Sequence, residues 1–162
     1  MKILGVDPGT ARIGWGVVLE AKGDCQVGDY GCLGTNPKLS EAGRLLKLFN
    51  GFTRILTKIK PDVVAAESLF FFKNQTTIIK VAQARGIILL AAEKLNMPIF
   101  SYTPLQVKMA VTGYGRAEKF QVQQMVKSIL KLNFIPQPDD TADALAIALA
   151  HAFSNKLKNK LK

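Results

Sequence analysis

The sequence contains few of the residues that build disulfide frameworks and transition-metal sites. Its 162 residues include two cysteines and one histidine. Cys25 and Cys32 have neither a zinc-site spacing nor a CxxC arrangement, so buried free thiols are the favoured interpretation and a disulfide between them is the alternative. We expect the lone histidine, His151, to be packed or solvated rather than a metal ligand.

Long apolar runs and nucleotide-binding loops are also missing. No run of apolar residues approaches the roughly 20 needed to span a membrane. Met1-Lys2 leads into a short predicted strand instead of an apolar leader, so a cytoplasmic location is expected. The pattern GxxxxGK[ST] does not occur, and Gly14-Trp15-Gly16 and Gly113-Tyr114-Gly115 lack the third glycine of a dinucleotide-binding loop.

Acidic residues are scarce compared with basic ones. The chain has 22 Lys and Arg against 12 Asp and Glu, a formal net charge of +10. This excess favours a polyanionic partner, most simply nucleic acid or an anionic membrane surface, and an ordinary basic protein is the alternative. Apolar residues make up 48% of the sequence, which excludes disorder of the whole chain and supports one domain with a full core.

The order of apolar patterns predicts an α/β domain over residues 1–154. Residues 155–162 form a basic tail that we expect to be disordered. Thr103-Pro104 is a predicted helix start, with Thr103 as the N-cap. The remaining expected elements are strands over 2–7, 13–20, 25–33, 63–66 and 98–102, and helices over 39–59, 75–95, 117–131 and from 139 onward.

Two predicted strands end in a carboxylate. The first is an apolar run that reaches Asp7, where Pro8 favours an extended backbone and Gly9 permits a tight turn. The run 63–66 repeats this design and ends in Glu67. A charge at the end of a buried strand is costly unless it is paired or holds a metal.

Two further acids share one face of the last predicted helix. Asp140 and Asp143 are three residues apart, and the surrounding apolar residues draw that face inward. Four converging carboxylates would repel one another without a cation, and all-oxygen ligation suits Mg²⁺ or Mn²⁺. Simpler roles remain open: Asp139 or Asp140 as a helix cap, Asp7 as a turn residue, and Glu67 paired with a lysine.

Residues 1–153 resemble the RuvC family of Holliday junction resolvases, the crossover junction endodeoxyribonucleases. The resemblance lies in a series of short motifs in a fixed order. They are Gly5-Val6-Asp7-Pro8-Gly9; Glu67 followed by Phe70 and Lys73-Asn74; Ala82-Gln83-Ala84-Arg85-Gly86; Gln106-Val107-Lys108; Ala117-Glu118-Lys119; and Asp140 with Asp143-Ala144-Leu145-Ala146.

The resemblance implies a ribonuclease-H-like fold, with a mixed five-stranded sheet flanked by helices, and a homodimer. It makes Asp7, Glu67, Asp140 and Asp143 the catalytic, metal-binding acids. Phe70 matches an aromatic that stacks on a junction base, although Phe71-Phe72 blurs which ring does so. Asp139 beside Asp140 makes the third acid ambiguous, and the spacing to Asp143 favours Asp140. Lys108 and Lys119 match phosphate-contacting residues, and we predict that Lys73 and Arg116 also bind DNA.

The activity implied is resolution of four-way DNA junctions by symmetric phosphodiester hydrolysis in recombination and repair. We expect two Mg²⁺ ions per subunit, with Mn²⁺ as a substitute, products carrying 5′-phosphate and 3′-hydroxyl ends, and a branch-migration helicase as partner. One alternative is an ATPase, because Asp7-Pro8-Gly9-Thr10 also resembles the phosphate loop of actin-like ATPases and sugar kinases, although those chains are much longer. Another is a DNA-binding module without catalysis.

Overall fold

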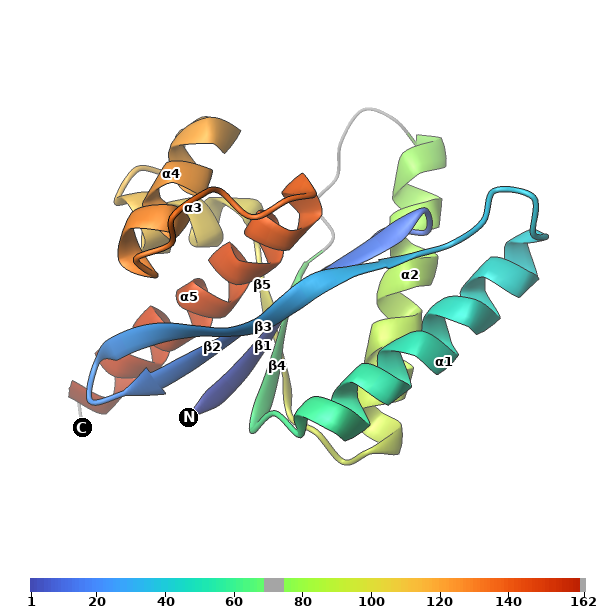
Figure 1. The fold of residues 1–162 in the computed structure, drawn as a ribbon, viewed down its shortest axis with the longest axis horizontal. Helices are drawn as coiled ribbons and strands as arrows, with labels where there is room; N and C mark the ends of the chain where they lie inside the picture. The colour runs from blue at the N-terminus through green and yellow to red at the C-terminus, as the bar shows by residue number, and fades with distance from the viewer. Residues whose placement is uncertain (69–74, 161–162) are drawn as a thin grey trace.

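The fold is a sheet with helices on both of its faces (Figure 1). The computed structural model describes the backbone of residues 1–68 and 75–160, and the side chains of 1–68 and 78–154. Phe70 and Lys73 lie outside the described residues. The strands are β1 Lys2–Asp7, β2 Arg12–Ala21, β3 Asp24–Gly34, β4 Val63–Glu67 and β5 Ile99–Tyr102. The helices are α1 Glu41–Ile59, α2 Gln75–Lys94, α3 Pro104–Thr112, α4 Lys119–Ile129 and α5 Asp139–Lys160.

The strand order is β3-β2-β1-β4-β5. β1, β2 and β3 pair antiparallel, whereas β4 pairs parallel with β1 and β5 pairs parallel with β4. The predicted α/β class and mixed five-stranded sheet are therefore confirmed. Because β1 and β4 are parallel neighbours, their carboxyl-terminal residues lie at the same end of the sheet.

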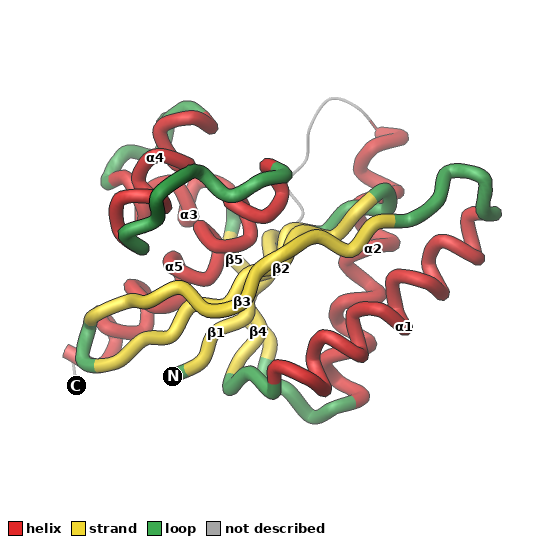
Figure 2. The backbone as a smooth tube through the Cα atoms, in the orientation of Figure 1, coloured by secondary structure: helices red, strands yellow, loops and turns green. Residues whose placement is uncertain are grey.

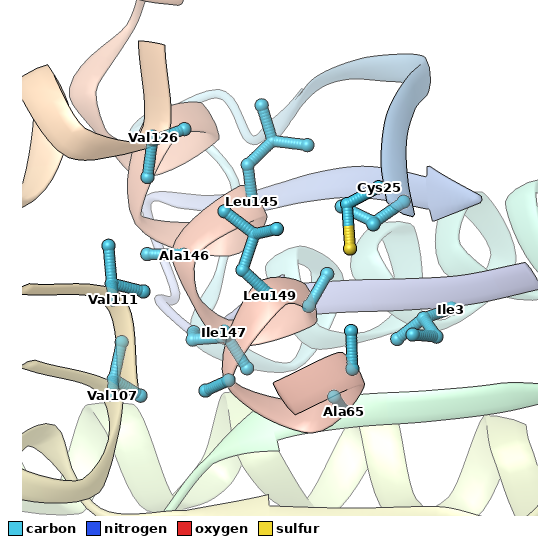
Figure 3. Close-up of a cluster of buried hydrophobic side chains, with 14 of the residues drawn as sticks. Ile3, Cys25, Ala65, Val107, Val111, Val126, Leu145, Ala146, Ile147 and Leu149 are labelled. Atoms are coloured by element: carbon cyan, nitrogen blue, oxygen red, sulfur yellow. The ribbon is translucent and has the colours of Figure 1, made fainter. Parts of the chain in front are cut away.

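The helices divide into two layers (Figure 2). α1 and α2 cover one face, where Phe52 and Ile88 pack on the sheet. α3, α4 and α5 cover the other face, and Figure 3 shows Leu145 and Leu149 of α5 among the buried side chains there. The apolar segment 86–92 of α2 faces the core on one side only, since Leu90 is 57% exposed.

The alternation of side chains decides which face the strand-end acids occupy. In β1, Val6 packs in the α1/α2 core and Ile3 in the α5 core. Side chains two or four residues apart share a face, so Asp7 lies on the α5 side with Ile3. The same parity places Glu67 on that side with Ala65. α5 can therefore bring a third acid toward both.

Two glycines let α5 lie directly on the strands. A Cβ at Gly5 of β1 would overlap the backbone of Ala144, and one at Gly14 of β2 would overlap the backbone of Asp140. Gly14 is also the register partner of Asp7. The close approach of backbone to backbone thus sets how near the first turn of α5 lies to the end of β1.

Several local predictions can be compared with the structure. Thr103 caps α3, because its hydroxyl accepts from the backbone N–H of Gln106 at 3.1 Å. Cys25 and Cys32 are free thiols. α5 is helical as far as Lys160, so the backbone of the expected tail continues the helix up to that residue. None of the helices in the described part of the chain combines the length and apolar character needed to cross a bilayer.

Candidate active site

Three of the four predicted acids line one cavity. Asp7 at the end of β1, Glu67 at the end of β4 and Asp143 in α5 border a space of about 240 Å³. Lys108 of α3 and Lys119 at the start of α4 border the same cavity. Its other described lining residues are Pro104, Val107, Val122, Ala146 and Ile147. The cavity therefore joins carboxylates and ammonium groups over an apolar base.

Asp7 is the acid of the cavity whose pKa is raised to a value near neutral pH. Burial raises its pKa from 3.8 to about 7, and the charges of Glu67, Asp143 and Asp140 add to this effect. Lys119 acts in the opposite sense and lowers the pKa. Loss of water around the carboxyl and repulsion from the neighbouring acids thus both favour its protonated form.

The other two acids of the cavity are perturbed for the same reasons. Burial raises the pKa of Glu67, and the charge of Asp143 raises it further. Burial also raises the pKa of Asp143, while a hydrogen bond and the charge of Lys119 partly offset this rise. Such raised values mark a site that favours an additional cation.

Lys119 is the cation that the chain itself supplies. Its Nζ lies 2.9 Å from Oδ2 of Asp143 and 3.4 Å from Oδ2 of Asp139. Burial lowers the pKa of Lys119, but the hydrogen bond and charge of Asp143, followed by Asp139, outweigh burial and raise it above its ordinary value. Lys119 therefore remains charged and neutralises part of the acid cluster.

Asp140 lies beside the cavity instead of within its lining. It borders an adjacent hollow of about 570 Å³, where Arg12 Nε lies 3.5 Å from its Oδ2. Asp140 nevertheless raises the pKa of both Asp7 and Asp143 by its charge. Asp139 and Asp140 both belong to the first turn of α5, and each is paired with a basic side chain.

The donor set fits a hard divalent cation in its chemistry. In the part of the chain that the structure describes, no group of three or more Asp, Glu, His or Cys side chains is arranged to hold a metal ion. Lys119 and Arg12 instead pair with Asp143 and Asp140. Carboxylate oxygens are nevertheless the ligands that Mg²⁺ and Mn²⁺ prefer, and burial together with the neighbouring carboxylates raises the pKa of Asp7 despite the charge of Lys119.

Comparison with known proteins decides the family. The profile of the family described as crossover junction endodeoxyribonuclease RuvC matches residues 3–151. The chain belongs to this family. It is 50% identical over 161 residues to crossover junction endodeoxyribonuclease RuvC of Fusobacterium nucleatum, covering 99% of this chain and 84% of the relative. It is 51% identical over 160 residues to the protein of the same name from Halothermothrix orenii, and the match covers 99% of this chain and 97% of that relative.

Solved structures support the same assignment. Thermus thermophilus RuvC in complex with Holliday junction substrate has a TM-score of 0.91 and 35% identity, and the match covers 98% of this chain and 96% of that one. The yeast mitochondrial Holliday junction resolvase matches with a TM-score of 0.68 and 17% identity, and the match covers 97% of this chain and 82% of that one. At that identity the second match shows only a shared fold.

The predicted DNA-binding residues fall into three groups. Lys108 and Lys119 lie in the acid-lined cavity, and their predicted contact with phosphate stays a prediction. Arg116 is exposed in the loop before α4 and is not part of the cavity lining. Phe70 and Lys73 are outside the described residues, so their roles stay predictions.

The sequence did not reveal two basic residues that bond to residues of the site or to the strands beside it. Arg85 Nε donates to the backbone carbonyl of Glu67 at 3.2 Å, and its Nη2 donates to Ser101 Oγ at 2.6 Å. Arg85 therefore ties α2 to the ends of β4 and β5. Arg12, the second, pairs with Asp140. Arg85 lies in a RuvC family motif, which could have suggested a role, whereas nothing in the sequence singles out Arg12.

His151 is packed away from these groups. It is 5% exposed, and its Nδ1 lies 2.8 Å from the hydroxyl of Tyr102. Its ring also lies against Phe100, with ring centroids 4.8 Å apart. Of the two roles expected for His151, packed or solvated, the structure shows the packed one.

Proposed function

We propose that this chain resolves four-way Holliday junctions in DNA by cleaving two opposed strands symmetrically. The convergence of Asp7, Glu67 and Asp143 with two lysines in one cavity carries the proposal. Membership of the RuvC family supports it, as does the 35% identical Thermus thermophilus RuvC, whose structure was solved with Holliday junction substrate. The net charge of +10 suits a polyanionic substrate.

The acids would hold divalent cations, and we propose two Mg²⁺ per subunit with Mn²⁺ as a substitute. Asp7, Glu67 and Asp143 would provide the ligands, with Asp140 from the adjacent hollow. When bound, such ions lower the pKa of a water molecule and stabilise negative charge on the leaving oxygen. Raised carboxyl pKa values favour this assignment, because a cation would remove the repulsion that causes part of the rise.

Lys108 and Lys119 bind the non-bridging oxygens of the scissile phosphate in this proposal. Lys119 lies against Asp143, so its ammonium can move from that carboxylate to an incoming phosphate over a short distance. The substrate thereby takes over a cation that the free protein uses to stabilise its acids. Water attacks phosphorus and the bond to the 3′ oxygen breaks, which leaves 5′-phosphate and 3′-hydroxyl ends.

Two symmetric nicks require two active sites, so we propose that the protein acts as a homodimer whose two-fold axis matches that of the junction. Phe70 would stack on a junction base, and Lys73 and Arg116 would contact the backbone. These roles rest on the family motifs, as do the proposed branch-migration helicase partner and the cytoplasmic location.

A mobile four-way junction and a linear duplex of the same sequence test the function, each incubated with and without Mg²⁺. We expect paired nicks in opposed strands of the junction, only with Mg²⁺, and none in the duplex. Binding without nicking would instead indicate a DNA-binding module. Equal cleavage of both substrates, or ATP hydrolysis without nicking, would also contradict the proposal.

A further inference from the structure

The acid-lined cavity is the first of three hollows that follow one another on the surface. The second hollow, of about 570 Å³, shares Lys119 with the cavity and is bordered by the β1–β2 turn, residues 9–12. The third hollow, of about 250 Å³, lies between α1 and α2 and shares Thr10 and Lys80 with the second. The depression at the acids therefore continues past the turn toward α2.

Basic side chains border the second and third hollows. Arg12 and Lys80 line the second, and Arg44 joins Lys80 in the third. The acids of the second hollow are already paired, Asp140 with Arg12 and Asp139 with Lys119. Lys80 is exposed and forms no ion pair with any described residue, so its charge remains for a ligand. The third hollow also contains the carboxylate of Glu41, which bonds to Gln83.

The turn between the hollows is held in place before any ligand arrives. Arg44 Nη2 donates to the carbonyl of Thr10 at 2.9 Å, and its Nε donates to Thr35 Oγ1 at 2.9 Å. Thr35 also donates from its backbone N–H to the carbonyl of Ala11 at 2.9 Å. These bonds use only some of the five N–H donors of a guanidinium, and they fix the turn that borders the second hollow together with Lys80.

Lys80 and Lys108 flank the acids from opposite faces of the sheet. Lys108 is on α3 and Lys80 is on α2, and these helices cover different faces (Figure 1). A strand whose scissile phosphate lies at Asp7 must continue on both sides of it, with one negative charge per nucleotide. The acids repel that backbone, so cations are needed on each side. The proposed function places Lys108 and Lys119 at the scissile phosphate, on the α3 and α4 side of the acids, and names no residue of α2 for the neighbouring phosphates.

We propose that Lys80 is the phosphate-binding residue of a second subsite for the cleaved strand, on the far side of the acids from Lys108. The ligand is a backbone phosphate a few nucleotides from the scissile one. Arg12 borders this subsite, and Arg44 positions the turn that forms its floor. This inference rests on the proposed function and extends it to the path of the DNA.

Lys80→Ala and Lys80→Gln test the subsite, with Lys58→Ala as the matched control. Lys58 is an exposed lysine in the last turn of α1. This turn lies at the end of the sheet opposite the acids, because the side chain of Lys2, at the start of β1, donates to the carbonyl of the neighbouring Ile59. Junction affinity is measured without Mg²⁺ over a range of salt concentrations. We expect both Lys80 variants to bind several-fold more weakly, with the slope of log affinity against log salt reduced by about one, and Lys58→Ala to match wild type.

Junctions with single methylphosphonates, which remove one backbone charge each, locate the contact. We expect one position near the scissile phosphate where the neutral group weakens wild-type binding but does not weaken Lys80→Ala further. The subsite would be overturned if both Lys80 variants kept the wild-type affinity and salt slope, or if every methylphosphonate weakened Lys80→Ala as much as it weakens wild type. The proposed function would still stand in that case, provided that the wild-type protein cleaves the junction. Wild-type protein that neither binds nor cleaves the junction would overturn both.

Discussion

Lys119 Nζ and Asp143 Oδ2 lie 2.9 Å apart in the cavity that Asp7 and Glu67 also line. The free protein thus stabilises its acid cluster with a side chain that the RuvC family motifs assign to DNA. Because the lysine lowers the pKa of all three carboxyls, it is part of the electrostatics of the acids as well as the proposed phosphate ligand. The predictions below follow from this double role.

Lys119→Gln should raise the carboxyl pKa values of the metal-free protein and reduce junction cleavage by roughly a hundredfold. The pKa values rise because the variant loses the positive charge that favours the ionised acids. Carboxyl carbon NMR over roughly pH 3–9 measures the pKa values. Single-turnover nicking of a four-way junction measures the cleavage rate. Lys127→Gln, on the last turn of α4, is the control. Unchanged titration of all three acids in Lys119→Gln would contradict this account of the ion pair.

Asp7→Asn should raise the Tm of the metal-free protein at alkaline pH. The pKa of Asp7 is about 7 in the folded state and 3.8 in the reference state, so the folded protein binds the proton more tightly. The stability contributed by this proton is fully present below the unfolded value and is lost as pH rises through about 7. The variant avoids this loss, which has an upper bound of about 4 kcal/mol.

Thermal unfolding of wild type and Asp7→Asn in EDTA at several pH values measures this effect. We expect the Tm difference to be largest near pH 8 and to shrink toward pH 4. Added Mg²⁺ should raise the Tm of wild type at pH 8 more than that of the variant. A wild-type Tm above that of the variant at pH 8 without metal would contradict the electrostatic strain assigned to Asp7.

Gly14→Ala should impair both folding stability and cleavage. The new methyl group would overlap the backbone of Asp140 and push the first turn of α5 away from the register partner of Gly14, which is Asp7. Overpacking of this kind costs about 1–3 kcal/mol. Gly34→Ala is the matched control, because a Cβ there meets no atom within 4 Å. Urea unfolding and junction nicking should distinguish Gly14→Ala from Gly34→Ala. Equal stability and equal nicking by both variants would show that the close approach of Asp140 to Gly14 is unimportant.

Arg85→Ala should reduce cleavage by loosening the end of β4. The substitution leaves the carbonyl of Glu67 and the hydroxyl of Ser101 without their donor, at a cost of about 1–3 kcal/mol. Arg85→Lys retains the charge but only part of the fork, so we expect intermediate activity. The concentration of Mg²⁺ that gives half-maximal cleavage should rise in both variants. If that concentration and the cleavage rate stay at wild-type values, Arg85 does not position Glu67.

The sequence predicted the acids at element ends because their patterns are local. An apolar run that stops at Asp7 or Glu67 identifies a strand end, and a three-residue spacing places Asp140 and Asp143 on one helical face. The alternation of side chains in β1 and β4 then fixes the face on which the first two acids lie.

What the sequence could not predict depends on packing between distant elements. The pairing of Lys119 with Asp143 joins α4 to α5, and that of Arg12 with Asp140 joins β2 to α5. The second pair draws Asp140 toward the adjacent hollow, although its spacing to Asp143 suggested a single cluster. Arg85 acts through the backbone carbonyl of Glu67, and although its family motif could suggest a role, the motif does not show this partner.

Cleavage of a synthetic four-way junction by Asp7→Asn, compared with wild type over a range of Mg²⁺ concentrations, tests most directly whether the gathered acids perform the hydrolysis. We expect wild type to produce paired nicks that depend on Mg²⁺, and Asp7→Asn to bind the junction with similar affinity but leave it intact. Nicking by Asp7→Asn at a rate near that of wild type, or nicking by wild type in EDTA, would contradict the account.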